Sequence, residues 1–255
     1  MSLPKSLPFV NLLTFVLTPA LVTLAGVMSP LSAQPFPESL ISLEFNIEEE
    51  DVDQPTSGTT GGGVRGRPSS CAEEGETSLT SLTPKSSPKT LTASAQPTFF
   101  VYVPKTQPQL AEFALYDEGR ELFQTNVTLS GKAGIVQISL PDNKSLEIGK
   151  DYLWQFTINC PSSNWGQNEM VWGVIRRTGE VANPDNQTDL SQLPGQEALL
   201  KQAQALADAK IWQDSLALLA QVRSSRPQEW EQFLQSVGLD EVAQAPFIDC
   251  CTLEN

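Results

Sequence analysis

The ten residues from Asp151 to Cys160, DYLWQFTINC, decide the fold class of this chain. Large apolar side chains alternate with polar ones, and one face of an extended strand would collect Tyr152, Trp154, Phe156, Ile158 and Cys160. A period of two is typical of a strand that is buried on one side. We therefore predict that this face lines the core and that Trp154, Phe156 and, from the following strand, Val174 are deeply buried.

Five further runs of strand-forming residues flank this one, and turn-forming residues separate them. They are residues 98–103 (TFFVYV), 111–117 (AEFALYD), 121–127 (ELFQTNV), 134–140 (GIVQISL) and 170–178 (MVWGVIRRT). Glu118-Gly119-Arg120 predicts a tight hairpin between the second and third runs. Six strands without a helical period between them indicate a mainly β fold with an α appendage. We predict an antiparallel immunoglobulin-like β-sandwich over residues 97–180, followed by a short helical hairpin and a C-terminal helix.

Residues 1–33 have the order of a secretory signal peptide. Lys5 precedes an apolar run from Phe9 to Val27, and the segment ends in Leu31-Ser32-Ala33. We expect cleavage near Ala33, although Leu31 is larger than the residue preferred three positions before a cut, and hence an extracytoplasmic protein in the periplasm or at the cell surface. A retained membrane anchor is the alternative, because the run approaches the roughly 20 residues that cross a bilayer.

Residues 34–96 differ in composition and are predicted to form a low-complexity or disordered arm. They hold the acidic run Glu48 to Asp53, the stretch SGTTGGG at 57–63, and many Pro, Ser and Thr residues from 78 to 88. The formal net charge of the chain is −14, and removal of Lys5 with the signal leaves −15. A chain this acidic, without a basic patch, is a poor ligand for nucleic acid or anionic lipid, so neither is expected as a partner.

The four cysteines fit an oxidising compartment. Cys71 precedes the first predicted strand of the sandwich and Cys160 ends the longest one, so we predict a disulfide between them. Closing that loop would contribute on the order of 4 kcal/mol in the chain-entropy model. Two unpaired thiols, or pairing with the tail, are the alternatives. Cys250 and Cys251 are adjacent, a spacing that rarely forms a disulfide, so they would pair elsewhere, pair between chains or stay free.

Residues 181–195 are predicted to be a linker, residues 196–240 a helical hairpin plus a further helix, and residues 241–255 a tail. The hairpin positions have offsets like those of one tetratricopeptide-type repeat, and they are Leu199, Ala203, Leu206, Lys210, Trp212, Ser215, Leu219, Val222 and Pro227. One such repeat cannot bury its own apolar stripe. We expect it to dock within the chain; a partner-binding surface that includes Trp212 is the alternative.

Several of these motifs together resemble a known family. In order they are CAEE at 71, LTSLTP at 79, PTFFVYVP at 97, AEFALYDEGRELF at 111, GIVQISLP at 134, IGKDYLWQFTINC at 148, GVIRR at 173 and IWQDSLALLAQVR at 211. Over residues 66–240 the chain resembles the cyanobacterial family catalogued as domain of unknown function 928. The resemblance implies an exported, periplasmic or surface protein, and it transfers no activity and no site residue.

The chain contains no histidine, which is the usual general base, triad partner and zinc ligand. A hydrolase that uses only carboxylates is the remaining enzymatic alternative, and its candidate residues are Glu112, Asp117, Glu118 and Glu169. Carboxylates of hairpins and loops are normally solvated, and no spacing marks a catalytic pair. We therefore expect that the protein is not an enzyme and that it has neither a cofactor nor a metal site.

Aromatic and basic side chains supply the remaining candidates. Trp165 lies in the loop PSSNWGQNE between Asn164 and Gly166, and it is a possible ligand or partner contact, whereas Trp172 is expected in the core. The pair Arg176-Arg177 is expected to be solvated or paired with carboxylates rather than to bind an anion.

Two functional classes remain. The first is an exported cell-envelope interaction or scaffold protein, whose partner is another exported or envelope protein. The second is a carbohydrate or small-ligand binding module. An exposed apolar groove on the helices would favour the first class, and paired exposed aromatic residues near Trp165 would favour the second.

Overall fold

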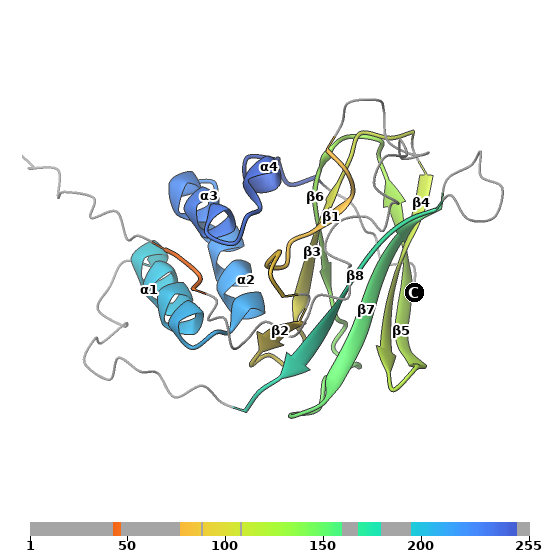
Figure 1. Cartoon of the computed structure of the whole chain (residues 1–255), viewed down its shortest axis with the longest axis horizontal. Coiled ribbons are helices and arrows are strands. Elements are labelled where there is room, and N and C mark those ends of the chain that lie inside the picture. Colours follow the sequence, from red (N-terminus) through yellow and green to blue (C-terminus); the bar gives the residue numbers. More distant parts are fainter. Residues whose placement is uncertain are drawn as a thin grey trace, which may run out of the picture. The chain divides into compact units, whose positions relative to one another are not determined.

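Eight strands in the described part of the chain form two sheets (Figure 1). The computed structural model describes residues 43–46, 77–87, 89–107, 109–159, 168–179 and 195–248, all within one compact unit, Leu40–Asn255. The strands are β1 (Thr80–Ser81), β2 (Lys89–Thr92), β3 (Thr98–Val103), β4 (Gln109–Asp117), β5 (Arg120–Leu129), β6 (Gly134–Ser139), β7 (Asp151–Ile158) and β8 (Glu169–Arg177). Their order is β1-β3-β6 in the three-stranded sheet and β2-β8-β7-β4-β5 in the five-stranded sheet.

Strand β3 is buried on both faces, which explains why it is apolar along almost its whole length. Phe99, Val101 and Val103 pack in one core with the five-stranded sheet, whereas Phe100 and Tyr102 join a second core formed with the helices. Successive side chains of a strand point to opposite faces, so this one strand contributes to two cores. The five-stranded sheet and the helices therefore lie on opposite sides of the three-stranded sheet.

The predicted core face of β7 is confirmed for its described residues. Tyr152, Trp154, Phe156 and Ile158 are at most 2% exposed. The prediction for Val174 and Trp172 is wrong, because both are only partly buried and lie on the other face of β8. Trp154 stands opposite Gly173, so the inward positions of β8 are Val171, Gly173 and Ile175. A glycine opposite Trp154 leaves room for the indole. The sequence pattern alone did not show which alternate residues of β8 face the core.

The predicted hairpin between β4 and β5 is confirmed. Glu118 and Gly119 form a two-residue turn with φ values of 49° and 80°, and Asp117 pairs with Arg120 across it. Positive φ at both turn residues matches the right-handed twist of the flanking strands, which is why glycine is favoured at the second position.

Strands β1 and β2 lie within the range 34–96 that was predicted to be a low-complexity arm, so that prediction is wrong for these residues. Leu79 and Leu82 are at most 1% exposed. The prediction of purely antiparallel pairing is also wrong, because β2 runs parallel to β8 with Thr90 opposite Ile175. Strands of two and four residues are too short to show a period of two, and the partner of β2 is more than eighty residues away in the sequence.

The helices are α1 (Gly195–Asp208), α2 (Trp212–Val222), α3 (Pro227–Gln235) and α4 (Asp240–Ala243). The predicted hairpin and third helix are confirmed, and so is their docking within the chain. The indole Nε1 of Trp212 donates a hydrogen bond to the carbonyl oxygen of Leu82 at 2.9 Å. The carboxylate of Asp214 accepts hydrogen bonds from the hydroxyl of Thr92 at 2.7 Å and from the backbone N–H of Ala93 at 3.0 Å. Within the described ranges, no helix is sufficiently long and apolar to cross a membrane.

The segment after α4 returns to the edge of the three-stranded sheet. Ile135 of β6 donates to the carbonyl of Pro246 at 2.7 Å and accepts from the N–H of Ile248 at 3.0 Å. The guanidinium of Arg223 lies 4.7 Å from the ring centroid of Phe247 and donates to the carbonyl of Ala245. Burial lowers the pKa of this guanidinium from its ordinary value. Part of the range predicted to be a tail therefore belongs to the folded body.

Candidate functional site

Two aromatic rings stack in the helical layer and form the centre of the candidate site. Trp212, at the start of α2, and Phe233 of α3 have ring centroids 4.7 Å apart and an interplanar angle of 9°. Both side chains are at most 1% exposed. Because Leu82 accepts the indole hydrogen bond, the loop after β1 fixes the orientation of Trp212.

The segment Leu43–Asn46 packs against this aromatic pair, and Figure 1 shows it in orange among the helices. The Phe45 ring stands edge-on to Trp212 at 5.0 Å and to Phe233 at 6.0 Å, with an interplanar angle of 81° in both cases. An edge-to-face arrangement places the positive ring edge against a negative ring face, and such pairs contribute about 0.5–1.5 kcal/mol beyond their buried area. Leu43 is 0% exposed and Phe45 is 7% exposed.

Two hydrogen bonds hold the backbone of the segment. The backbone N–H of Phe45 donates to the hydroxyl of Ser236 at 3.0 Å, and that hydroxyl donates to the carbonyl of Phe233 at 2.8 Å. The ammonium of Lys210 donates to the carbonyl of Asn46. Contacts of this kind recognise a backbone, whereas the ring contacts of Phe45 recognise a side chain. We call Lys210, Trp212, Phe233 and Ser236 together the Phe45 site.

The segment has the pattern of an extended peptide with two anchors. Leu43 and Phe45 are buried, whereas Glu44 and Asn46 are exposed. Side chains two positions apart point the same way in an extended chain, so one face of the segment carries both anchors. The helical layer can therefore hold an extended apolar-x-aromatic peptide, and here it holds one from its own chain.

Sequence reasoning did not find this segment, because it lies inside the range predicted to be an arm. The available signal was the alternation of Ile41, Leu43, Phe45 and Ile47 with three polar residues, directly before the acidic run Glu48 to Asp53. Alternation of this length is typical of a half-buried extended segment, but the composition of residues 34–96 as a whole predicts an arm, and that prediction did not use the local pattern.

Of the two predicted ligand or partner contacts, Trp165 and Trp212, only Trp212 lies within the described residues. Trp212 is 1% exposed, so its side chain meets Phe45 and Leu82 of its own chain and does not reach the surface as a partner contact. Trp165 lies outside the described residues, as do Cys71, Cys160, Cys250 and Cys251.

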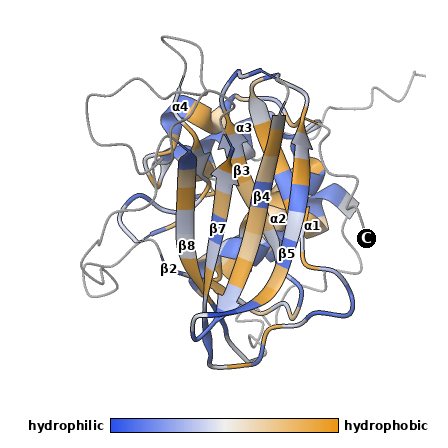
Figure 2. Ribbon diagram, turned by 90° about the vertical axis from the view of Figure 1, so that its right-hand side faces the viewer, coloured by the Kyte–Doolittle hydropathy of each residue, from blue (hydrophilic) through white to orange (hydrophobic). Residues whose placement is uncertain are grey.

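A second surface is the outer face of the five-stranded sheet, which Figure 2 views directly. Trp172 of β8 stands opposite Gln155 of β7, and Gln155 stands opposite Ala114 of β4. The neighbouring row places Met170 opposite Thr157 and Thr157 opposite Glu112. Among the described elements, the helices make their main strand contacts with β2 and β3, so this face is not their principal contact surface. It therefore offers a partly exposed indole beside amide and hydroxyl groups.

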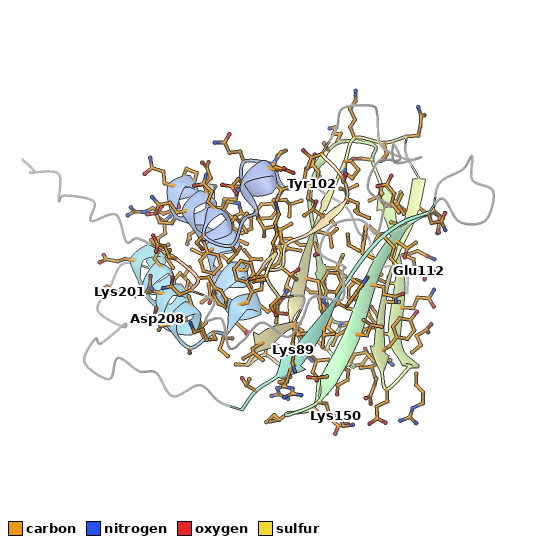
Figure 3. The ribbon with its side chains drawn as sticks, in the orientation of Figure 1. Lys89, Tyr102, Glu112, Lys150, Lys201 and Asp208 are labelled. Carbon is orange, nitrogen blue, oxygen red and sulfur yellow. The ribbon has the colours of Figure 1, made fainter. Side chains whose placement is uncertain are left out.

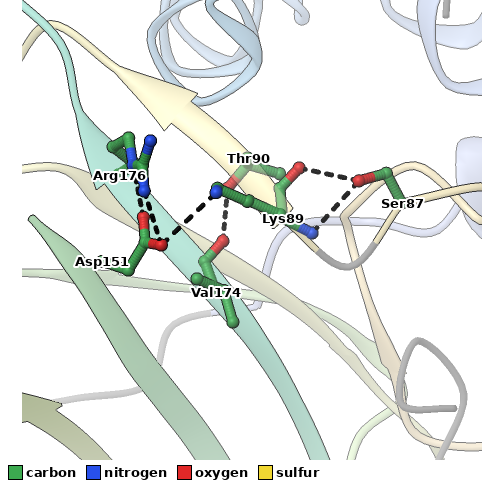
Figure 4. Close-up of polar contacts among 6 residues, drawn as sticks. All are labelled: Ser87, Lys89, Thr90, Asp151, Val174 and Arg176. Atoms are coloured by element: carbon green, nitrogen blue, oxygen red, sulfur yellow. Dashed lines mark hydrogen bonds and ion pairs between the residues drawn. The ribbon is translucent and has the colours of Figure 1, made fainter. Parts of the chain in front are cut away.

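Charged side chains gather at one end of the same sheet. Asp151 accepts hydrogen bonds from Arg176 at 2.8 Å and from Lys89 at 3.3 Å, as Figure 4 shows. The bond from Arg176 is the main cause that lowers the pKa of Asp151, and Lys89 adds to it. Lys150, labelled with Lys89 in Figure 3, forms ion pairs with Glu147 at 2.9 Å and with Asp117 at 3.6 Å. The hydrogen bond to Glu147 raises the pKa of Lys150.

This end of the sheet is an ion-pair network. The prediction that the pair Arg176-Arg177 is solvated or paired with carboxylates is confirmed for Arg176. Arg177 instead donates hydrogen bonds to the backbone carbonyls of Ala93 and Leu146. Of the four candidate carboxylates, Asp117 is paired with Lys150, Glu118 is exposed in the hairpin turn, and Glu112 lies on the outer face. Glu169 begins β8. Among the described residues, no group of three or more Cys, Asp or Glu side chains is arranged to hold a metal ion.

A comparison with protein families covers most of the chain. The model of a family described as Domain of Unknown Function (DUF928) matches residues 60–247, which are 188 of the 255 residues, and confirms the family that the sequence motifs indicated. A search of curated proteins finds no match to the chain. The matched range contains the whole Phe45 site, whereas the Leu43–Asn46 segment lies before it.

Proposed function

We propose, from the premise that the chain belongs to the DUF928 family, that it is an exported interaction or scaffold protein of the cell envelope. The observation that carries this proposal is the seating of Leu43–Asn46 on the Phe45 site. The helical layer binds an extended apolar peptide through two anchors and two backbone hydrogen bonds. Its partner is another exported or envelope protein with a segment of that pattern.

Export is part of the proposal and rests on residues 1–33 and on the cysteines. We infer that the signal is cleaved, that the mature chain lies in the periplasm or at the cell surface, and that Cys71 and Cys160 form a disulfide there. Peptide mapping of envelope-isolated protein without reductant tests this inference. Recovery of both cysteines as alkylatable thiols would contradict it.

The proposed role is binding, without catalysis and without nucleic acid or lipid as a partner. The charge of −14 and the ion-paired state of Asp117, Asp151 and Arg176 support this view. The finer assignment of the two sheets to an immunoglobulin-like sandwich belongs to the same proposal, and the shared core between the sheets supports it.

The decisive experiment separates the segment from the body without removing it. A site for a sequence-specific protease is inserted in residues 57–63 of the full chain, and the purified mature protein is cleaved there. The N-terminal fragment contains no cysteine, so only noncovalent contacts then retain it. A labelled peptide of residues 40–48 is added in excess, and the same peptide with Phe45→Ala is the matched control.

We expect the fragment to stay bound after cleavage and to be replaced by the wild-type peptide but not by the control peptide. Size-exclusion chromatography of the labelled peptide with the cleaved protein measures this. A fragment that never exchanges would be a permanent part of the core, and that result contradicts a peptide-binding function. A fragment that leaves without being replaced by the peptide contradicts it equally.

A carbohydrate or small-ligand binding module is the second candidate, and the row Trp172–Gln155 supports it. An aromatic face beside amide groups can contact the C–H face of a sugar ring and its hydroxyls. Affinity electrophoresis in neutral polysaccharide tests it. Retardation of the wild type that Trp172→Ala abolishes would favour this candidate, and equal mobility with and without polysaccharide would exclude it for that glycan.

A further inference from the structure

We propose that the Leu43–Asn46 segment is exchanged between copies, so that the Phe45 site of one chain binds the segment of a second chain. This inference rests on the proposed function, because it requires that the site bind a separable peptide. It names the partner as a second copy of the chain. The product is an exchanged dimer, or a longer assembly if the exchange is not reciprocal.

Each copy carries both halves of the contact. The segment contributes Phe45 and two backbone groups, and the site contributes Trp212, Phe233, Ser236 and Lys210. Every one of these contacts can form identically when the segment comes from another chain. Exchange of an identical element conserves the intrachain contacts, which is why it is a low-cost route to dimers.

Chain length separates the segment from its own body. Thirty residues, 47–76, lie between Asn46 and Thr77, the next described residue. Fully extended, a stretch of that length spans at most about 100 Å, so length alone does not restrict the segment to its own Phe45 site. The family match begins at residue 60 and therefore includes the site without its occupant.

Mass action determines when exchange occurs. A segment in the same chain meets its own site at an effective concentration that does not depend on the protein concentration, whereas a second copy supplies the segment in proportion to that concentration, so the intrachain contact dominates in dilute solution. Shortening the tether removes this advantage once the intrachain span exceeds the reach of the chain. The length of the chain between Asn46 and Thr77 therefore determines whether the segment binds its own site or the site of a second copy.

Deletion of residues 47–70 tests the inference in the otherwise complete mature chain. Six residues, 71–76, then join Asn46 to Thr77, and the Cα atoms of these two residues can be at most about 25 Å apart. The deletion retains Cys71. The matched control is the same shortened chain with Phe45→Ala, and light scattering coupled to size-exclusion chromatography measures the mass of each.

We expect the shortened chain to have at least twice the monomer mass and the Phe45→Ala control to be monomeric. A dimer that persists in the control overturns the inference. A shortened chain that stays monomeric leaves the decision to the mixing experiment with full-length chains, because six residues would then still reach the Phe45 site of the same chain. If the fragment exchange of the cleaved full-length protein succeeds while mixed full-length chains show no energy transfer, the peptide-binding function stands and the exchange between copies fails.

A second measurement decides the matter if the shortened chain does not fold or stays monomeric. Two preparations of the full-length mature chain, labelled with a donor and an acceptor dye, are mixed at concentrations up to the millimolar range. Energy transfer that rises with concentration and is lost in Phe45→Ala supports exchange. Energy transfer that is absent at every concentration, or unaffected by Phe45→Ala, overturns it.

Discussion

Substitution of two buried tryptophans by phenylalanine should have unequal consequences for stability. Trp154 and Trp212 are 2% and 1% exposed, and each packs against two aromatic rings. The indole N–H of Trp212 donates to the carbonyl of Leu82. Among the described residues, no acceptor lies within hydrogen-bonding distance of the buried indole nitrogen of Trp154.

The magnitude follows from this one difference, because Trp154→Phe and Trp212→Phe remove the same atoms and their cavity costs largely cancel. Trp212→Phe leaves the carbonyl of Leu82 without its partner, which costs about 1–3 kcal/mol. Trp154→Phe removes a buried indole N–H that has no acceptor. Loss of this unfavourable group offsets about 1–3 kcal/mol of the free energy that the new cavity costs. We therefore expect Trp212→Phe to lower the free energy of unfolding by at least about 2 kcal/mol more than Trp154→Phe does.

Urea denaturation followed by far-ultraviolet circular dichroism measures the difference, since the peptide backbone dominates this signal and the midpoint is read from each variant's own transition. With an m value of about 2–3 kcal/mol per molar, a difference of about 2 kcal/mol separates the midpoints by roughly 0.7–1 M, and a larger difference separates them further. Trp154→Ala, which loses the whole ring system, should cost about 3–5 kcal/mol and serves as the large-cavity reference. Equal midpoints for the two phenylalanine variants, or a lower midpoint for Trp154→Phe, would refute the reasoning.

Two further predictions concern the C-terminal segment and the ion-pair network. A Cβ atom at Gly134 would lie 2.5 Å from Cγ2 of Ile248, so Gly134→Ala should displace the segment that contains Ile248 and lower the free energy of unfolding by about 1–3 kcal/mol. The backbone N–H of Ile248, which donates to Ile135, should then exchange faster with solvent. Gly179→Ala is the matched control, because a Cβ atom there meets open space. Arg176 lowers the pKa of Asp151, so this carboxylate stabilises the fold above its unfolded pKa and loses that contribution as the pH falls through the lower folded value. Asp151→Asn should therefore reduce stability by less than about 1 kcal/mol at pH 7, because the group is 41% exposed, and by still less at pH 3. A deficit in urea titrations that is larger at pH 3 than at pH 7 would contradict the pairing.

Local sequence pattern was sufficient for the long elements of the fold. The period of two in residues 151–158 identified the core face, and Glu118-Gly119 identified the hairpin, because both signals depend on residues that are close in the chain. The same pattern failed for Val174, since the side of β8 that faces the core depends on which of its residues stands opposite Trp154. Strand β2 was missed because a short strand becomes visible only through its partner.

For the candidate site, too, the sequence predicted one part and missed another. The sequence singled out Trp212 and the apolar stripe of the helical hairpin, and it left open whether they dock within the chain or bind a partner. It assigned no role to Leu43 and Phe45, because the overall composition of residues 34–96 predicts an arm, although these two residues alternate with polar ones.

The sequence by itself determined which segments become the long strands and the helices, because periodicity and turn residues act over a few positions. It also determined the acidic, histidine-free character that argues against several chemistries. Only the tertiary structure decided that Phe45 meets Trp212 and Phe233, residues that lie more than 160 positions away. Packing between distant segments depends on the shape and burial of both partners at once, so neither segment encodes the contact alone.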